Sequence, residues 1–128
     1  MGIVVKDLDR ELESYHRLFG VKPSTVKLAM DGRLRVAFIP VGDGEIELLQ
    51  PLDPSILFGR FLQTHGQGIH HIALETDDIE AEVERLRKEG VTFDTLNPRV
   101  GAHGVKIIFT EPQTTGDIAV EICEMSHR

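Results

Sequence analysis

The stretch Gly68-Ile69-His70-His71-Ile72-Ala73-Leu74-Glu75 decides how this chain is read. Apolar side chains recur at every second position in it, as they do along a β-strand. Ile72 and Leu74 fall on one face of the predicted strand and His71 falls on the other. The strand also opens the second of two similar halves. An imidazole turned away from the aliphatic core, in a repeated unit, indicates a metal site built from an internal repeat.

Length and composition exclude several classes of protein. The 128 residues, 41% of them hydrophobic, suffice for a single domain over residues 1–128 with a proper hydrophobic core. The net charge of −7 argues against nucleic acid as a partner. No apolar segment reaches the roughly 18 residues of a membrane span, so we expect no membrane partner. The single cysteine, Cys123, makes a reducing, cytoplasmic location the default.

The first 50 residues predict a strand, a helix and three further strands. A short buried strand is expected over residues 2–5. Asp7 or Asp9 then caps a helix that ends at Gly20. Hairpin turns at 30–32 and 42–44 separate strands expected over 24–29, 34–40 and 45–49.

The same order returns after a connector over residues 51–68, in which a short helix is expected to start at 53–55. A strand from His71 leads to a helix that ends at Gly90, and strands follow near 91–94, 105–109 and 118–123. When the two halves are aligned, Asp7 matches Asp78 and Phe38 matches Phe109, both with an offset of 71 residues. We interpret this as an α+β fold of two tandem βαβββ modules, about 1–50 and 69–124, forming an incomplete β-barrel around a metal site. The alternative is coincidence between two ordinary α+β patterns.

Two carboxylates occupy matching places in the modules. Glu47 and Glu121 each lie between aliphatic residues in the last strand of a module, and so point away from the helix-covered core, as His71 does. Pairing of the modules about a pseudo-twofold axis would bring the three groups into one concave surface. An imidazole with carboxylates suits Mn, Co, Ni, Zn or Fe. The simpler interpretation is two solvated glutamates and a surface or hydrogen-bonded histidine, since no contiguous metal-binding motif is present.

Five stretches carry a resemblance to a known family: VKDLD (5–9), VAFIPVGD (36–43), EIELLQPL (45–52), GQGIHHIA (66–73) and GAHG (101–104). The double histidine and the GAHG loop are the more discriminating ones. The chain resembles the vicinal oxygen chelate superfamily and, within it, the methylmalonyl-CoA epimerase family. The resemblance implies a metal held by a first-strand histidine and a last-strand Glu or Gln of each module.

Three of these ligands match residues of this sequence: Glu47, His71 and Glu121. The fourth, the first-module partner of His71, falls one position before Met1. Either the first strand begins further upstream than Met1, or the site has three protein ligands. We favour the upstream start, because residues 2–5 are short for a central strand.

The resemblance further implies an isomerase that interconverts (R)- and (S)-methylmalonyl-CoA by α-proton abstraction through a metal-stabilised enolate. Glu121 and Glu47 are the expected catalytic residues, one divalent ion (Co, Mn, Zn, Ni or Fe) is the expected cofactor, and an acyl-CoA is the expected substrate of a homodimer. One alternative is a glyoxalase I-like isomerase, which turnover of a glutathione hemithioacetal would distinguish. Another is a non-catalytic, bleomycin-resistance-like binding protein, which would not need these three residues.

Two further side chains share these regions. Cys123 follows Glu121 by two residues and shares its face; we expect a small packing residue, because no adjacent base in the sequence would activate its thiol. His103, in a glycine-flanked loop, is either a hydrogen-bonding group for substrate or a structural part of the loop.

Overall fold

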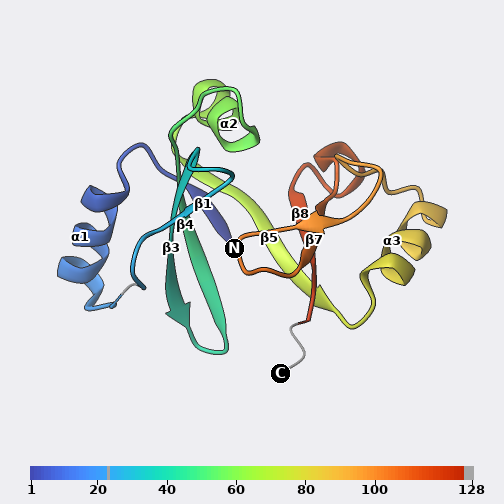
Figure 1. Cartoon of the computed structure of the whole chain (residues 1–128), viewed down its shortest axis with the longest axis horizontal. Coiled ribbons are helices and arrows are strands. Elements are labelled where there is room, and N and C mark those ends of the chain that lie inside the picture. The colour runs from blue at the N-terminus through green and yellow to red at the C-terminus, as the bar shows by residue number, and fades with distance from the viewer. Residues whose placement is uncertain (23, 126–128) are drawn as a thin grey trace. The chain divides into compact units, whose positions relative to one another are not determined.

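The same strand and helix pattern occurs twice along the chain (Figure 1). The computed structural model describes residues 1–22 and 24–125. Internal contacts divide the chain into two units, the first running from Met1 to His70 and the second starting at His71. The boundary lies within strand β5 (Gly68–Thr76).

The first unit contains β1 (Gly2–Val4), α1 (Leu8–Phe19), β2 (Lys27–Ala29), β3 (Leu34–Val41), β4 (Gly44–Pro51) and α2 (Leu57–His65). Its strands lie in the order β2-β3-β4-β1, with β1 parallel to β4 and the other pairs antiparallel. Helix α1 begins where predicted, because the Asp7 carboxylate accepts a hydrogen bond of 3.2 Å from the Arg10 amide. It ends at Gly20, whose φ of +68° suits a residue without a Cβ.

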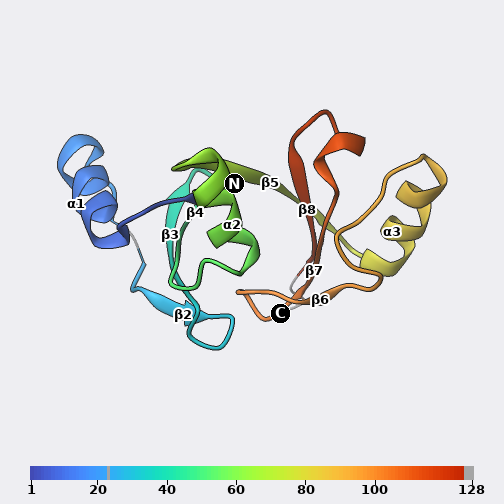
Figure 2. The ribbon, with the colours of Figure 1, turned by 90° about the horizontal axis from the view of Figure 1, so that it is seen from above.

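One face of this sheet is covered by α1 (Figures 1 and 2). The buried cluster between them consists of Val5, Leu8, Ala37, Ile39 and Leu48. Because side chains alternate along a strand, Glu47, next to Leu48, points to the opposite face. The predicted orientation of Glu47 is therefore confirmed.

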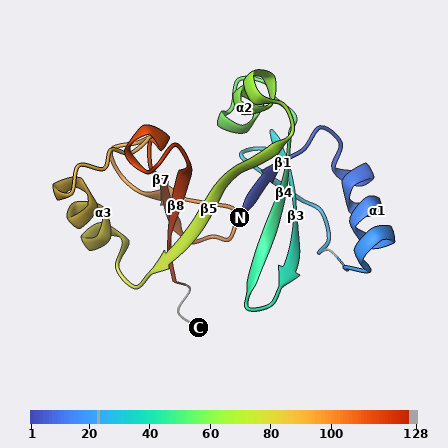
Figure 3. The ribbon, with the colours of Figure 1, turned by 180° about the vertical axis from the view of Figure 1, so that it is seen from behind.

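The second unit contains the rest of β5, α3 (Ile79–Lys88), β6 (Arg99–Val100), β7 (Lys106–Phe109), a 3-10 turn (Pro112–Thr114) and β8 (Ala119–Glu124). Its strand order, β5-β8-β7-β6, matches the order β1-β4-β3-β2 of the first unit. The first and last strands of the unit are again parallel. Asp78 caps α3 through a bond of 3.1 Å from the Ala81 amide, as Asp7 caps α1. Figure 3 shows this unit from behind.

Strand register repeats between the two units residue by residue. Glu47 on β4 lies between Gly2 on β1 and Phe38 on β3. Glu121 on β8 lies between Ala73 on β5 and Phe109 on β7. The prediction of two tandem βαβββ modules in an α+β fold is thus confirmed.

Two predicted strands have different bounds, for one shared physical reason. The strand expected at 24–29 begins only at Lys27, because Ser24 Oγ accepts the Phe38 amide at 2.9 Å in place of a backbone carbonyl. The prediction of a strand near 91–94 is wrong. Only a single bridge, from Phe93 to Thr110, forms there, and β6 lies later in the chain. Asp94 Oδ1 accepts the Phe109 amide at 3.2 Å. In each module a side-chain oxygen thus takes the donor that a regular ladder would use.

The connector helix also starts later than expected. Asp53 Oδ1 accepts hydrogen bonds from the amide and the hydroxyl of Ser55, at 2.8 and 2.7 Å, which makes a turn instead of a first helical turn. Helix α2 then begins at Leu57. None of the helices among the described residues is long and apolar enough to cross a membrane.

Candidate metal centre

His71 lies on β5 with only 1% of its surface exposed. It occupies the face opposite to the core of its unit, where Ile79 and Val83 of α3 pack on the sheet. The Phe109 ring meets the imidazole edge-on, with 4.9 Å between ring centroids. The alternation of the strand thus predicted the face of His71, and the aromatic side chain of β7 packs against its imidazole.

Glu121 lies beside His71 on the parallel strand β8. Its Oε1 is 4.0 Å from His71 Nε2, and its side chain is 13% exposed. This distance exceeds that of a hydrogen bond. With metal–ligand bonds of about 2.1 Å, two ligands of one ion lie between about 3 Å apart at a right angle and about 4.2 Å apart when opposite. The pair therefore fits two ligands of one divalent ion.

Glu121 also has a partner that the sequence analysis did not foresee. Cys123 Sγ donates a hydrogen bond of 3.1 Å to Glu121 Oε1. Cys123 was expected only to pack, yet its thiol directs the carboxylate beside the imidazole. The two-residue spacing on one strand was the signal, since it puts both side chains on the same face.

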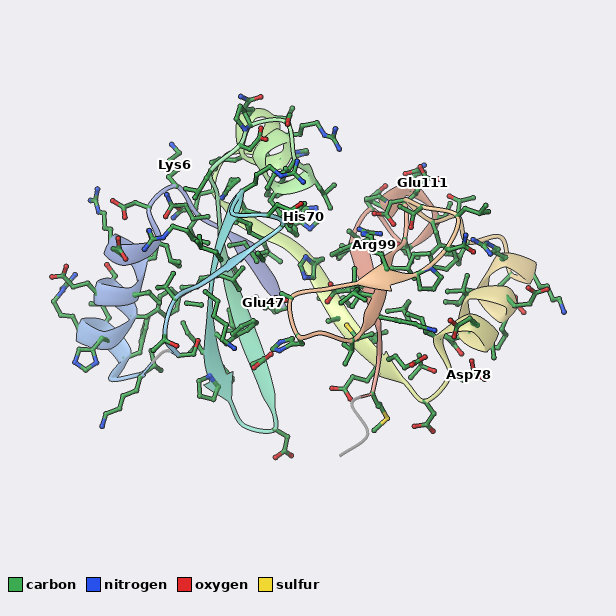
Figure 4. The ribbon with its side chains drawn as sticks, in the orientation of Figure 1. Lys6, Glu47, His70, Asp78, Arg99 and Glu111 are labelled. Atoms are coloured by element: carbon green, nitrogen blue, oxygen red, sulfur yellow. The ribbon has the colours of Figure 1, made fainter. Side chains whose placement is uncertain are left out.

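Glu47 belongs to the first unit and is marked in Figure 4. It is half-buried on β4, and its amide donates a hydrogen bond of 2.8 Å to the Met1 carbonyl. Its place between Gly2 and Phe38 corresponds to that of Glu121 between Ala73 and Phe109. The structure thus brings His71 and Glu121 together in one unit and gives Glu47 the equivalent position in the other.

Register also tests the offset between the two modules. Glu121 pairs with Ala73, two residues after His71, whereas Glu47 pairs with Gly2. Gly2 therefore corresponds to Ala73, which gives the same offset of 71 residues as the alignment of the two halves.

A cation lies over the phenylalanine of each module. Lys27 Nζ is 5.9 Å from the centroid of Phe38, and Arg99 Cζ is 5.6 Å from the centroid of Phe109. Lys27 pairs with Val36 and Arg99 with Ile107, two residues before the respective rings. The sequence analysis missed both cations, although they precede their phenylalanines by similar intervals.

The GAHG loop forms the turn between β6 and β7. A Cβ on Gly101 would come within 2.8 Å of Ile107 Cγ1, so this position requires glycine. His103 is exposed at the tip of the turn. The structure therefore gives the loop a tight backbone path, and both expected roles of His103, a substrate contact and a structural part of the loop, stay predictions.

Three comparisons place the chain among known proteins. The family model of the glyoxalase/bleomycin resistance protein/dioxygenase superfamily matches residues 1–109. Human mitochondrial methylmalonyl-CoA epimerase is 32% identical over 123 residues, which cover 95% of this chain and 70% of that protein. Ethylmalonyl-CoA/methylmalonyl-CoA epimerase of Cereibacter sphaeroides is 32% identical over 124 residues, covering 95% and 92%. A variant of Streptomyces coelicolor methylmalonyl-CoA epimerase in complex with 2-nitronate-propionyl-CoA superposes with a TM-score of 0.90 at 27% identity, over 98% of this chain and 94% of that one.

Proposed function

Because the chain belongs to the glyoxalase/bleomycin resistance protein/dioxygenase superfamily, we propose that it is a metal-dependent epimerase that interconverts (R)- and (S)-methylmalonyl-CoA. The observation that carries this proposal is the buried His71 beside Glu121, at a separation that two ligands of one ion adopt. The named epimerases among the relatives support the reaction class. One of them is named for ethylmalonyl-CoA as well, so the acyl group is the most specific part of the proposal.

In this proposal Glu47, His71 and Glu121 hold the ion, each with one ligand atom. One imidazole nitrogen and two carboxylate oxygens suit Co, Mn, Zn, Ni or Fe. When bound, such an ion acts as a Lewis acid that lowers the cost of negative charge on the thioester oxygen.

The side chains supply the proton transfers. Epimerisation removes the proton of the carbon between thioester and carboxylate and returns a proton to the opposite face of that carbon. The Glu121 carboxylate accepts or returns that proton on one face, and Glu47 has this role on the other. The Cys123 thiol, which stays reduced in the proposed cytoplasmic location, keeps Glu121 Oε1 oriented. In this proposal His71, which is buried, would hold the ion through Nε2, the nitrogen that faces Glu121.

Proton NMR of methylmalonyl-CoA in heavy water tests this function. The protein is first freed of metal with a chelator and then supplied with cobalt or manganese. Metal-dependent loss of the α-proton signal, with interconversion of the epimers, is the expected result. Absence of exchange with either metal would contradict the proposal, and turnover of a glutathione hemithioacetal instead would favour a glyoxalase I-like isomerase.

We propose that the enzyme is a homodimer. Ile72 and Leu74, on the face of β5 opposite to His71, are 38% and 55% exposed. Adjacent exposed aliphatic side chains on a strand favour contact with a second surface. The molar mass measured by light scattering should be twice the 14.3 kDa of one chain.

A further inference from the structure

Arg99 presents an unusually ordered cation on the same side of the second unit as His71. Its guanidinium lies over the Phe109 ring, and the same ring contacts the His71 imidazole. Arg99, labelled in Figure 4, is therefore separated from the proposed metal ligand by a single aromatic side chain.

Asp94 holds one end of this guanidinium. Arg99 Nη1 and Nη2 donate to Asp94 Oδ1 and Oδ2 at 3.2 and 2.8 Å. Asp94 is itself fixed, because its Oδ1 accepts the Phe109 amide and its own amide donates to the Phe109 carbonyl. Arg99 thus enters any binding event with its planar group already oriented.

One edge of the Arg99 guanidinium is left for a ligand. The second Nη1 hydrogen goes to Thr95 Oγ1 at 3.2 Å. Of the five N–H donors, those on Nε and the outer side of Nη2 find no acceptor among the described residues. They lie along a single edge of the planar group, and this edge matches the two oxygens of a carboxylate or phosphate. The side chain as a whole is 39% exposed, so Arg99 is accessible to a ligand.

The first unit offers a contrast. Lys27 occupies the equivalent register position over Phe38, so both modules place a cation there. Lys27 is exposed, and within residues 1–22 and 24–125 no hydrogen bond or ion pair holds its ammonium. A lone flexible ammonium binds anions as a point charge, without the geometry of a fork. Of these two cations, Arg99 is the one that combines a fixed orientation with two parallel donors.

We propose that Arg99 binds an anionic group of the acyl-CoA substrate, a carboxylate or a phosphate, through its Nε and Nη2 donors. This inference rests on the proposed function for the identity of the ligand. A carboxylate would come from the acyl group and a phosphate from coenzyme A. Loss of a bidentate charge-assisted contact should weaken binding about ten- to a hundredfold.

Calorimetric titration of three ligands tests the proposal and separates the two anions. Methylmalonyl-CoA carries both groups, propionyl-CoA carries only the phosphates, and the N-acetylcysteamine thioester of methylmalonate carries only the carboxylate. Each is titrated into wild-type protein and into Arg99→Gln and Arg99→Lys, with Arg85→Gln on α3 as the matched control. Arg99→Lys keeps the charge and removes the fork, so the assignment can still be tested if Arg99→Gln fails to fold.

Selective weakening of the two carboxylate ligands would assign the acyl carboxylate, and selective weakening of the two CoA ligands would assign a phosphate. Affinities within twofold of wild type for all three ligands would overturn the proposal, as would equal losses in Arg85→Gln. Wild-type protein that binds none of them would overturn both this inference and the proposed function. Binding without α-proton exchange would contradict the function alone, because the affinities of the Arg99 variants remain measurable.

Discussion

The thiol of Cys123 donates a hydrogen bond of 3.1 Å to Glu121 Oε1, the same oxygen that lies 4.0 Å from His71 Nε2. A carboxylate on a strand has several rotamers of similar energy, and a fixed donor selects among them. Cys123 thus contributes to the order of the proposed metal site without being one of its proposed ligands.

We predict that Cys123→Ala weakens metal binding about two- to tenfold, the net worth of one hydrogen bond. Cys123→Ser should restore most of the affinity, because a hydroxyl can donate to the same oxygen. Titration with cobalt, followed by absorption, measures both variants. A sulfur-to-cobalt charge-transfer band in the wild type would mean that Cys123 is itself a ligand, and our assignment would then be wrong.

Glu121→Gln should abolish α-proton exchange while leaving the fold intact. An amide is nearly isosteric with the carboxylate but cannot accept the proton, and loss of general base catalysis typically costs about a hundred- to ten-thousandfold in rate. Exchange in heavy water gives the rate, and circular dichroism monitors the fold. Glu84 is an exposed carboxylate on α3, and the variant Glu84→Gln serves as the control. Retained exchange would remove Glu121 from the mechanism.

Removing a residue that only orients a metal ligand typically lowers the metal affinity roughly ten- to a hundredfold. His71→Ala should lower the metal affinity by more than this, because it removes a proposed ligand. The alanine would also leave a buried cavity beside Phe109, which should lower the melting temperature. Calorimetry with cobalt or manganese measures the affinity. His103→Ala, which alters an exposed loop side chain, should bind metal as the wild type does; equal losses in the two variants would contradict the assignment of His71.

The ion pair between Glu80 and Lys106 should make stability depend on pH at both extremes. Lys106 Nζ donates to Glu80 Oε1 at 2.7 Å. This bond holds the pKa of Glu80 below 4.5 and raises the pKa of Lys106 above 10.5. The lowered carboxyl pKa contributes stability that is present above pH 4.5 and lost as pH falls through the folded-state value. The raised lysine pKa contributes stability that is present below pH 10.5 and lost as pH rises through the folded-state value.

Glu80→Gln should therefore melt slightly below the wild type at neutral pH, and the difference should vanish in acid. The groups are exposed, so the effect is small and should shrink with added salt. Thermal melts at several pH values and two salt concentrations measure it. A difference of the same size in acid would exclude the ion pair as its cause.

Leu74→Glu should convert the proposed homodimer to a single chain. A buried charge at an apolar contact costs far more than one facing solvent. Light scattering across a concentration series gives the mass. Leu96→Glu, which changes a leucine that is 76% exposed in the second unit, is the control and should leave the mass unchanged. An unchanged mass for Leu74→Glu would exclude this face as the contact.

The sequence alone determined which residues share a face and how the halves correspond. Alternation along a strand is a local property, so Glu47, His71 and Glu121 could each be assigned to the face away from the helix. Helix caps are local as well: Asp7, one of the two predicted candidates, caps α1, and Asp78, which corresponds to it in the second half, caps α3. The repeat offset then followed from matching these local features.

Tertiary structure decided the strand bounds and the surroundings of each functional side chain. Ser24 and Asp94 end regular pairing by accepting amides 14 and 15 residues away in the sequence, which no local pattern encodes. The contact of His71 with Phe109 and the ordering of Arg99 by Asp94 also depend on residues of other segments of the chain. Periodicity sets the direction of a side chain, whereas its distance to a partner on another strand depends on how the sheet assembles.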